Sequence, residues 1–225
     1  MAAESTKTPS TGKFTFIPDF LSSGEAEVLF ETCRTGLSWR EVKWGSTGRK
    51  LPRLVAQVED ISDFTGLARE ARKVIPLIVT MGYAVTGLWC NHYRDGSDHT
   101  PEHRDSDRRE LERSDCDRRE LERSDTYGCT VGCLSLGGPR VLNTRPEEKG
   151  VKGKITKRVL PSGSFYLFDQ EFNRTHLHAI PKSTAMTNPR ISLVFFLLEW
   201  KVPVPPSDSR RELHADTLTT AKALD

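Results

Sequence analysis

The amino-acid sequence predicts an α+β protein in which two helices precede a β-sandwich or jelly roll. Apolar residues recur at helical spacing in the first third of the chain, and this spacing ends near Gly82. Beyond it, short apolar runs alternate with Gly, Pro and Asn, which is typical of strands joined by turns. The last run, ISLVFFLL at 191–198, is apolar on both faces, so we expect it to be buried between a sheet and its cover.

The first helix is predicted to begin after Ser22, because Ser22 and Glu25 form a capping-box signature. Its apolar face would comprise Ala26, Leu29, Phe30 and Cys33. A second helix is predicted from about Asp63 as far as Pro76, because proline lacks the N–H that a helix interior needs. Its inward residues would be Leu67, Ala71, Val74 and Ile75.

The strands are predicted from runs rich in β-branched and aromatic residues. In chain order these runs are YAVTGLWCNHY, YGCTVGCLSLG, RVLNTRP, ITKRVLP, GSFYLFD and RISLVFFLLEW. Short strands of this kind, separated by turns, pack as two sheets in a sandwich or a jelly roll.

Length and composition favour one domain over residues 14–201. The first 13 residues are rich in Ser, Thr, Lys and Pro and are predicted to be disordered, and residues 202–225 form a polar tail. No apolar run reaches the roughly 18 residues that span a bilayer, and the N-terminus lacks the apolar core of a signal peptide. The sequence therefore predicts a monomer of the nucleus or cytoplasm, neither secreted nor in a membrane.

Charge and cysteine content narrow the kinds of protein that the sequence can encode. Five cysteines, an odd number at scattered spacing, favour reduced thiols over a disulfide framework. A net charge of +2 gives no bulk electrostatic argument for nucleic-acid binding, so any such binding must depend on local patches. One basic segment, KGVKGKITKR at 149–158, could neutralise phosphates; a solvated hairpin is the alternative.

A duplicated segment interrupts the chain. DRRELERSD occurs at 107–115 and again at 117–125. Two polar copies are too few to stack as a solenoid. We therefore predict that residues 106–125 form a charged, solvated insertion, with a dedicated binding arm as the alternative.

The candidate chemistry lies just before this segment, in EHRDSDRREL. Protein kinases also use HRD, but they need Asn five residues after the Asp and a Gly-rich loop upstream, and position 110 is Glu110. His103 and Asp105 are two residues apart, so on an extended chain both point to the same side, as two ligands of a 2-His-1-carboxylate iron site would. HLHAIP at 176–181 offers His176 or His178 as the third ligand.

A wider set of residues accompanies this pair. NHYRDGSDHTPEHRD places Asn91 and Tyr93 on one face of the preceding strand, and PRISLVFF supplies Arg190 downstream. With the GS-initiated strand and HAIP, these residues resemble the AlkB-type 2-oxoglutarate and Fe(II)-dependent dioxygenases over positions 51–196. The resemblance is closest to the eukaryotic branch that repairs alkylated duplex DNA. It implies a double-stranded β-helix (jelly roll) core with N-terminal helices packed on the sheet.

The resemblance also implies which residues bind the metal and the cosubstrate. Iron would be held by His103, Asp105 and His178. His178 is preferred over His176 because it precedes Ala-Ile-Pro at the family's spacing. Asn91 and Tyr93 would hydrogen-bond 2-oxoglutarate, and Arg190 would pair in bidentate fashion with its distal carboxylate.

Three further residues would contact the damaged base or the duplex: Trp44, Arg53 and Asp107. Arg53 belongs to LPRLVAQVED at 51–60, which resembles the family's nucleotide-recognition lid. Trp44 lies near the place of an aromatic wedge that fills the gap left by a flipped base, with core packing as the alternative. Asp107 takes one acidic position of the family, whereas Ser106 replaces the other. Phe196 stands where the family has a second arginine, which removes a polar contact near the cosubstrate.

The implied activity is oxidative dealkylation of nucleobases of the 1-methyladenine and 3-methylcytosine type in DNA. Fe(II), O2 and 2-oxoglutarate would be used, and succinate, CO2 and formaldehyde released. DNA is the favoured partner, ahead of RNA. The alternatives are an RNA demethylase, a 2-oxoglutarate oxygenase acting on another substrate, and a non-catalytic nucleic-acid-binding module.

Overall fold

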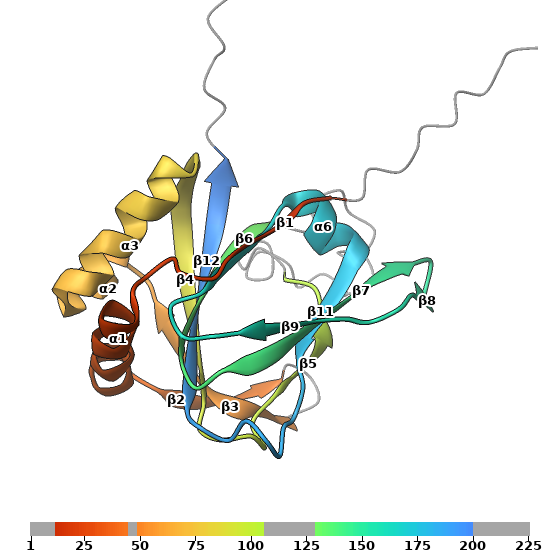
Figure 1. Cartoon of the computed structure of the whole chain (residues 1–225), viewed down its shortest axis with the longest axis horizontal. Helices are drawn as coiled ribbons and strands as arrows, with labels where there is room; N and C mark the ends of the chain where they lie inside the picture. Colours follow the sequence, from red (N-terminus) through yellow and green to blue (C-terminus); the bar gives the residue numbers. More distant parts are fainter. Residues whose placement is uncertain (1–11, 45–48, 106–128, 200–225) are drawn as a thin grey trace, which may run out of the picture.

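Two antiparallel sheets and a layer of helices make up the protein (Figure 1). The computed structural model describes residues 12–44, 49–105 and 129–199. The predicted insertion 106–125 and tail 202–225 lie outside these described residues, as does nearly all of the predicted N-terminal segment 1–13. No helix in the described ranges is long and apolar enough to cross a bilayer.

In chain order the elements are β1 (Phe14–Ile17), α1 (Ser23–Gly36), β2 (Arg40–Trp44), β3 (Arg49–Val58), α2 (Ile61–Leu67), α3 (Arg69–Thr80), β4 (Tyr83–Tyr93), β5 (Thr100–His103), β6 (Thr130–Gly137), β7 (Arg140–Glu148), β8 (Val151–Lys152), β9 (Thr156–Leu160), β10 (Phe165–Phe168), α6 (Gln170–Thr175), β11 (His176–Ile180) and β12 (Arg190–Glu199). The larger sheet has seven strands in the order β1-β10-β6-β12-β4-β3-β2. The smaller sheet has the order β5-β11-β7-β8, with β9 also paired to β7. This architecture confirms the predicted jelly-roll core preceded by helices.

Helices α1, α2 and α3 cover the outer face of the larger sheet (Figure 1). The predicted capping box is present at α1: the Ser22 side chain accepts from the backbone N–H of Glu25, whose own side chain accepts from the Ser22 backbone. The buried residues of these three helices are Ala26, Leu29 and Cys33 of α1, Phe64 of α2, and Ala71, Val74 and Ile78 of α3. The first helix is therefore as predicted, with Phe30 only half-buried at the edge of the same core.

The second helix was predicted wrongly in extent. The chain forms two helices there, because Ala68 is extended (φ −157°, ψ 164°) and separates α2 from α3. Helix α3 also continues past Pro76 to Thr80. Ile78, beyond the proline, is fully buried against the sheet, and this packing offsets the hydrogen bond that the proline cannot make.

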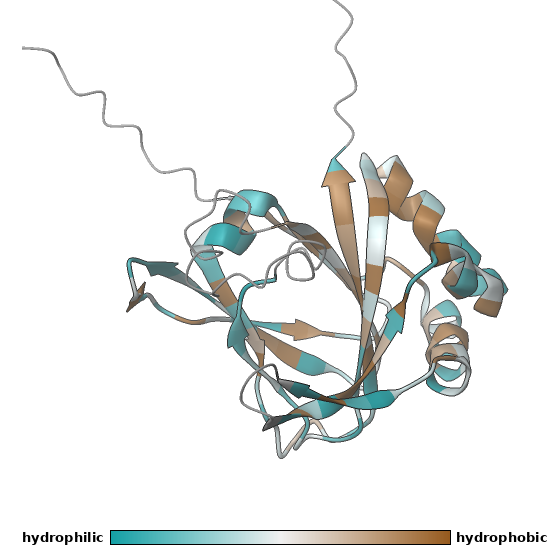
Figure 2. Ribbon diagram, turned by 180° about the vertical axis from the view of Figure 1, so that it is seen from behind, coloured by the Kyte–Doolittle hydropathy of each residue, from teal (hydrophilic) through white to brown (hydrophobic). Residues whose placement is uncertain are grey.

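Strand β12 is the central strand of the larger sheet, and both of its faces are buried as predicted from Arg190 to Leu193. Farther along, Val194 and Phe196 are half-buried and Leu198 is exposed. One face carries Ile191, Leu193, Phe195 and Leu197, which join the core under the helices. Figure 2 shows this hydrophobic strand beside the helices that cover it. The other face carries Arg190 and Ser192 toward the smaller sheet, so the space between the sheets receives polar side chains.

Several elements had not been predicted: the ten-residue strand β3 and the shorter β1, β2, β5, β8 and α6. Segment 51–60, likened to a lid, forms most of β3, which pairs with β4 within the larger sheet; its role as a lid stays a prediction. β5 has the sequence TPEH, in which no apolar alternation marks a strand. Polar residues replace that alternation because this strand carries part of the candidate site.

Candidate metal centre and its surroundings

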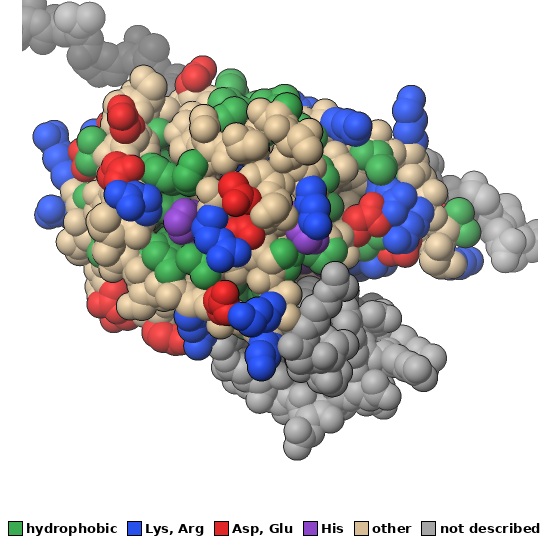
Figure 3. All heavy atoms as spheres, turned by 90° about the horizontal axis from the view of Figure 1, so that it is seen from below, with side chains coloured by type: hydrophobic (Ala, Val, Ile, Leu, Met, Phe, Trp, Pro, Cys, Tyr) green, Lys and Arg blue, Asp and Glu red, His purple; other side chains and the backbone are tan. Residues whose placement is uncertain are grey.

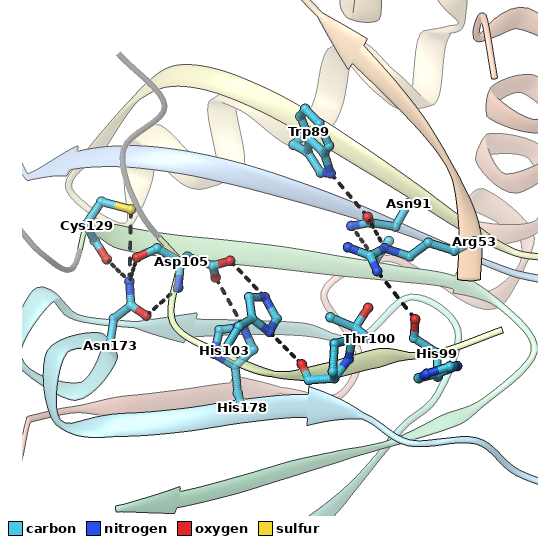
Figure 4. A network of polar contacts seen from close by, with 12 residues as sticks. Arg53, Trp89, Asn91, His99, Thr100, His103, Asp105, Cys129, Asn173 and His178 are labelled. Atoms are coloured by element: carbon cyan, nitrogen blue, oxygen red, sulfur yellow. Dashed lines mark hydrogen bonds and ion pairs between the residues drawn. The ribbon is translucent and has the colours of Figure 1, made fainter. Parts of the chain in front are cut away.

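Three predicted residues meet where the end of β5 lies against the middle of β11. His103 is the last residue of β5 and lies directly opposite His178 in the antiparallel register of β11. Nε2 of His103 lies 3.4 Å from Oδ1 of Asp105, and Nε2 of His178 lies 3.3 Å from Oδ2. The three candidate ligand atoms all lie within 4.8 Å of one another (Figure 4). The arrangement fits one small cation, although ligation itself stays a prediction.

The charge states of these side chains suit a metal. Burial alone would raise the pKa of Asp105, but the imidazoles of His178 and His103 outweigh it and hold that pKa below its usual range. Burial lowers the pKa of His178, and the neighbouring His103 lowers it further. An ionised carboxylate and a neutral imidazole are the forms that bind metal ions.

The orientation of His103 is fixed by its other ring nitrogen. Nδ1 of His103 lies 2.9 Å from the carbonyl oxygen of Pro101. Because a carbonyl can only accept, Nδ1 must carry the proton, which leaves Nε2 of the neutral ring with a lone pair that could bind a metal.

His176 is placed elsewhere. Its ring stacks on Phe172 at 3.9 Å and 5°, and its Nδ1 lies 3.0 Å from Oγ1 of Thr175. Of the two histidines in HLHAIP, it is therefore His178 that the structure brings to Asp105, and its role as a ligand stays a prediction.

Arg190 lies deeper between the sheets, opposite Tyr93 in the register of β12 and β4. It is fully buried, its Nε donates to Oγ of Ser135 at 2.9 Å, and its guanidinium lies 5.1 Å from the centre of the Tyr93 ring. Both terminal nitrogens are buried without a hydrogen-bond partner among the described residues. A buried guanidinium with two free donors fits an anionic ligand, and a carboxylate best of all.

Asn91 and Arg53 form a second polar group beside it. Nε of Arg53 donates to Oδ1 of Asn91 at 2.7 Å, and Trp89 donates to the same oxygen at 3.2 Å. Nδ2 of Asn91 reaches Oγ of Ser192 at 3.4 Å, so its amide nitrogen is the part left with bonding capacity. Arg53 lies in this network, and its predicted contact with substrate is untested. The side chain of Trp44 and all of Asp107 lie outside the described residues.

Sequence reasoning missed two residues of the site, Arg140 and Asn173. Arg140 is fully buried and donates to three backbone carbonyls, those of Asp95, Asp98 and Pro181. Asn173 is buried and hydrogen-bonds to the backbone of Asp105. No motif marked either residue, because arginine and asparagine are mostly exposed and gain meaning only from what surrounds them.

Phe196 lies farther along β12 than Arg190, opposite Gly87 of β4 and Val131 of β6. Strand β12 carries no second arginine elsewhere that could take over the missing contact, because Arg190 is the only arginine in residues 190–199.

The fold has known relatives among solved structures, whereas no protein-family model and no curated protein matched the sequence. The non-heme alpha ketoglutarate dependent epimerase SnoN from nogalamycin biosynthesis superposes with a TM-score of 0.51, at 16% identity, over 96% of this chain and 91% of its own. OsALKBH1 superposes with a TM-score of 0.51, at 13% identity, over 84% of this chain and 100% of its own. This chain has their fold. SnoN has also been solved with Fe3+, alpha ketoglutarate and nogalamycin RO, with a TM-score of 0.51 and 15% identity to this chain.

Proposed function

We propose that this protein is an Fe(II)- and 2-oxoglutarate-dependent dioxygenase that oxidatively removes alkyl groups from nucleobases in DNA. The observation that carries the proposal is the cluster of His103, Asp105 and His178, whose candidate ligand atoms lie within 4.8 Å of one another in a jelly-roll fold. Two histidines and one carboxylate on one face are the donor set of non-haem Fe(II) oxygenases. When bound, Fe(II) with 2-oxoglutarate and O2 supplies the oxidation, which yields succinate and CO2.

The residues around Arg190 would hold 2-oxoglutarate. Its distal carboxylate would take the two donors of Arg190 that have no partner in the described part of the chain. The Nδ2 group of Asn91 and the hydroxyl of Tyr93, which lies 2.7 Å from Oγ1 of Thr100, would bond the same molecule along its length. A solved structure of the same fold supports this chemistry, since SnoN was solved with Fe3+ and alpha ketoglutarate.

The basic segment at β8 and β9 supports a nucleic-acid substrate. Of its five basic residues, Lys152 pairs with Glu102 at 3.1 Å, and Arg158 lies over the rings of Phe14 and Phe16. The three that remain are Lys149, Lys154 and Lys157, all exposed and without an ion pair among the described residues. On the face shown in Figure 3, basic and acidic side chains are mixed, so phosphate binding would depend on this local segment.

Arg53, Asp107 and Trp44 are proposed to contact the flipped base and the duplex, DNA before RNA. Hydroxylation of an N-methyl group would give an N-hydroxymethyl group, whose C–N bond breaks to release formaldehyde and the repaired base. An enzyme acting on a base inside a duplex must turn it out of the stack.

The test is release of succinate and formaldehyde by protein loaded anaerobically with Fe(II), then given O2, 2-oxoglutarate and oligonucleotides containing 1-methyladenine or 3-methylcytosine. The matched variants are His178→Ala and His176→Ala, because both histidines lie on β11 and only His178 faces Asp105. We expect coupled release from the wild type and His176→Ala, and none from His178→Ala.

Three other outcomes would change the proposal in different ways. Succinate without formaldehyde would keep the oxygenase and reject these bases as substrates. Coupled release with RNA but not DNA oligonucleotides would assign the RNA demethylase. Neither product, with Fe(II) bound, would overturn the proposal as a whole.

A further inference from the structure

One buried amide side chain holds the backbone of Asp105. Asn173 of α6 is 1% exposed, and its Oδ1 accepts from the backbone N–H of Asp105 at 3.1 Å. Its Nδ2 donates to the carbonyl oxygen of Asp105 at 2.9 Å and to the carbonyl oxygen of Cys129 at 3.0 Å (Figure 4). Asp105 and Cys129 are the residues on either side of segment 106–128. A single side chain therefore fixes the chain at both ends of that segment.

The position of Asp105 needs such support. Strand β5 ends at His103, so Asp105 lies beyond the last ladder pair of the smaller sheet. Within the described residues, its backbone N–H and C=O are hydrogen-bonded to Asn173. A reciprocal pair of bonds to one amide fixes the orientation of that backbone unit, and thus the direction in which the carboxylate leaves the chain.

Helix α6 is a rigid base for this contact. Asp169 caps it by accepting from the N–H of Phe172 at 2.7 Å, and Phe172 stacks between Phe168 and His176. The helix runs without a break into β11, which carries His178. Asn173 therefore ties Asp105 to the same unit that positions His178.

We propose that Asn173 is a positioning residue for the metal centre. It fixes the direction in which the carboxylate of Asp105 points, and this direction does not depend on segment 106–128. The chain carries DRRELERSD twice in that segment. Because Asn173 is bonded to the residues at both ends of the segment, the length of the segment could vary without moving Asp105. The inference rests on the proposed function only in requiring that the three residues bind a divalent metal.

The test is Co(II) titration of the metal-free full-length protein, followed by the visible absorption of bound Co(II). We expect Asn173→Ala to weaken Co(II) binding about 10- to 100-fold and to change the absorption band, because residues that orient metal ligands have effects of this size. Asn173→Ser, a milder change, should weaken binding in the same direction and serves if the alanine variant does not fold.

The matched control is Asp169→Ala, which removes the α6 cap without touching Asp105. It should lower the melting temperature while leaving Co(II) affinity and the absorption band unchanged. If the control and Asn173→Ala shift affinity equally, Asn173 serves only to stabilise the helix, and the proposal is wrong.

Deletion of residues 117–125 tests the independence from the segment. Co(II) affinity should be unchanged in the deleted protein, and a loss as large as that of Asn173→Ala would overturn this part. Wild-type protein that binds no Co(II) would overturn both this inference and the proposed function. Normal Co(II) binding without turnover would overturn the proposed function alone and leave the role of Asn173 standing.

Discussion

Arg140 and Arg190 are two fully buried arginines that flank the same ring, and they differ in what their nitrogens meet. Their guanidinium carbons lie 5.4 Å and 5.1 Å from the centre of the Tyr93 ring. The terminal nitrogens of Arg140 donate to the carbonyls of Asp95, Asp98 and Pro181 at 2.7–2.9 Å. Those of Arg190 have no partner within the described ranges.

The difference separates a structural residue from a binding residue. A buried arginine keeps its charge, so hydrogen-bond acceptors or an opposite charge must replace the water that it loses. Arg140 finds such acceptors in three backbone oxygens, which join the loop after β4 to the end of β11. Among the residues that the structure describes, Arg190 contacts only Ser135 and the Tyr93 ring in this way, so the fold bears an uncompensated cost that an anionic ligand would relieve. Burial alone does not tell these roles apart, and the hydrogen bonds do.

The largest expected effect is on stability, from Arg140→Met. The variant leaves three carbonyl oxygens without donors, and we expect a loss of about 3 kcal/mol in the free energy of unfolding. Denaturant unfolding of the metal-free protein measures it. Arg34→Met, at an exposed pair with Glu31, is the control and should show no measurable loss. An equally stable Arg140→Met protein would mean that Arg140 too is held for a ligand.

The second effect is on binding, from Arg190→Met. We expect 2-oxoglutarate to bind about 100-fold more weakly, since a charge-assisted bidentate contact contributes roughly 3 kcal/mol. The unfolding free energy should stay the same or rise, because a charge with few partners leaves the core. Calorimetric titration of Mn(II)-loaded protein measures the affinity. A 2-oxo acid without the distal carboxylate is the control and should bind both proteins alike; equal weakening would remove Arg190 from the carboxylate site.

The sequence predicted most of this fold because its long elements carry strong patterns. The runs that form β4 and β12 were both predicted as strands, and in the structure they pair at the centre of the larger sheet. The capping box identified α1. The break at Ala68 escaped prediction because its only local signal is Gly66, and a single glycine is tolerated inside a helix and does not fix where the helix ends.

In the candidate site, too, the residues with a local sequence pattern were predicted and those without one were not. His103 and Asp105 were found because a spacing of two on an extended chain is visible in the sequence. Arg140 and Asn173 could not be found, because their bonds go to backbone atoms that are 41 to 68 residues away. Bonds to a distant backbone put no constraint on the partner's residue type, and they leave no motif.

The smallest expected effect is on the pH dependence of stability, and it concerns His92, which shares one feature with Arg190. Both ring nitrogens of His92 are buried without a partner among the described residues, and its ring lies 5.2 Å from that of Trp39. Unlike arginine, histidine can give up its charge, and burial lowers the pKa of His92. The unfolded chain, with a pKa of about 6.5, therefore takes up a proton first as the pH falls. The stability contributed by His92 is complete above that value and is lost as the pH falls from there toward the lower folded pKa.

We therefore expect His92→Phe to flatten the pH dependence of stability between about pH 7 and pH 5.5, by less than roughly 1 kcal/mol. Urea unfolding of the wild type and the variant across this range measures the difference. Part of the acid sensitivity should remain, because burial also lowers the pKa of His176 and His178. Equal slopes would mean that water reaches the nitrogens of His92. The free donors of Arg190 could then be hydrated in the same way, and the evidence for its role would rest on the 2-oxoglutarate titration.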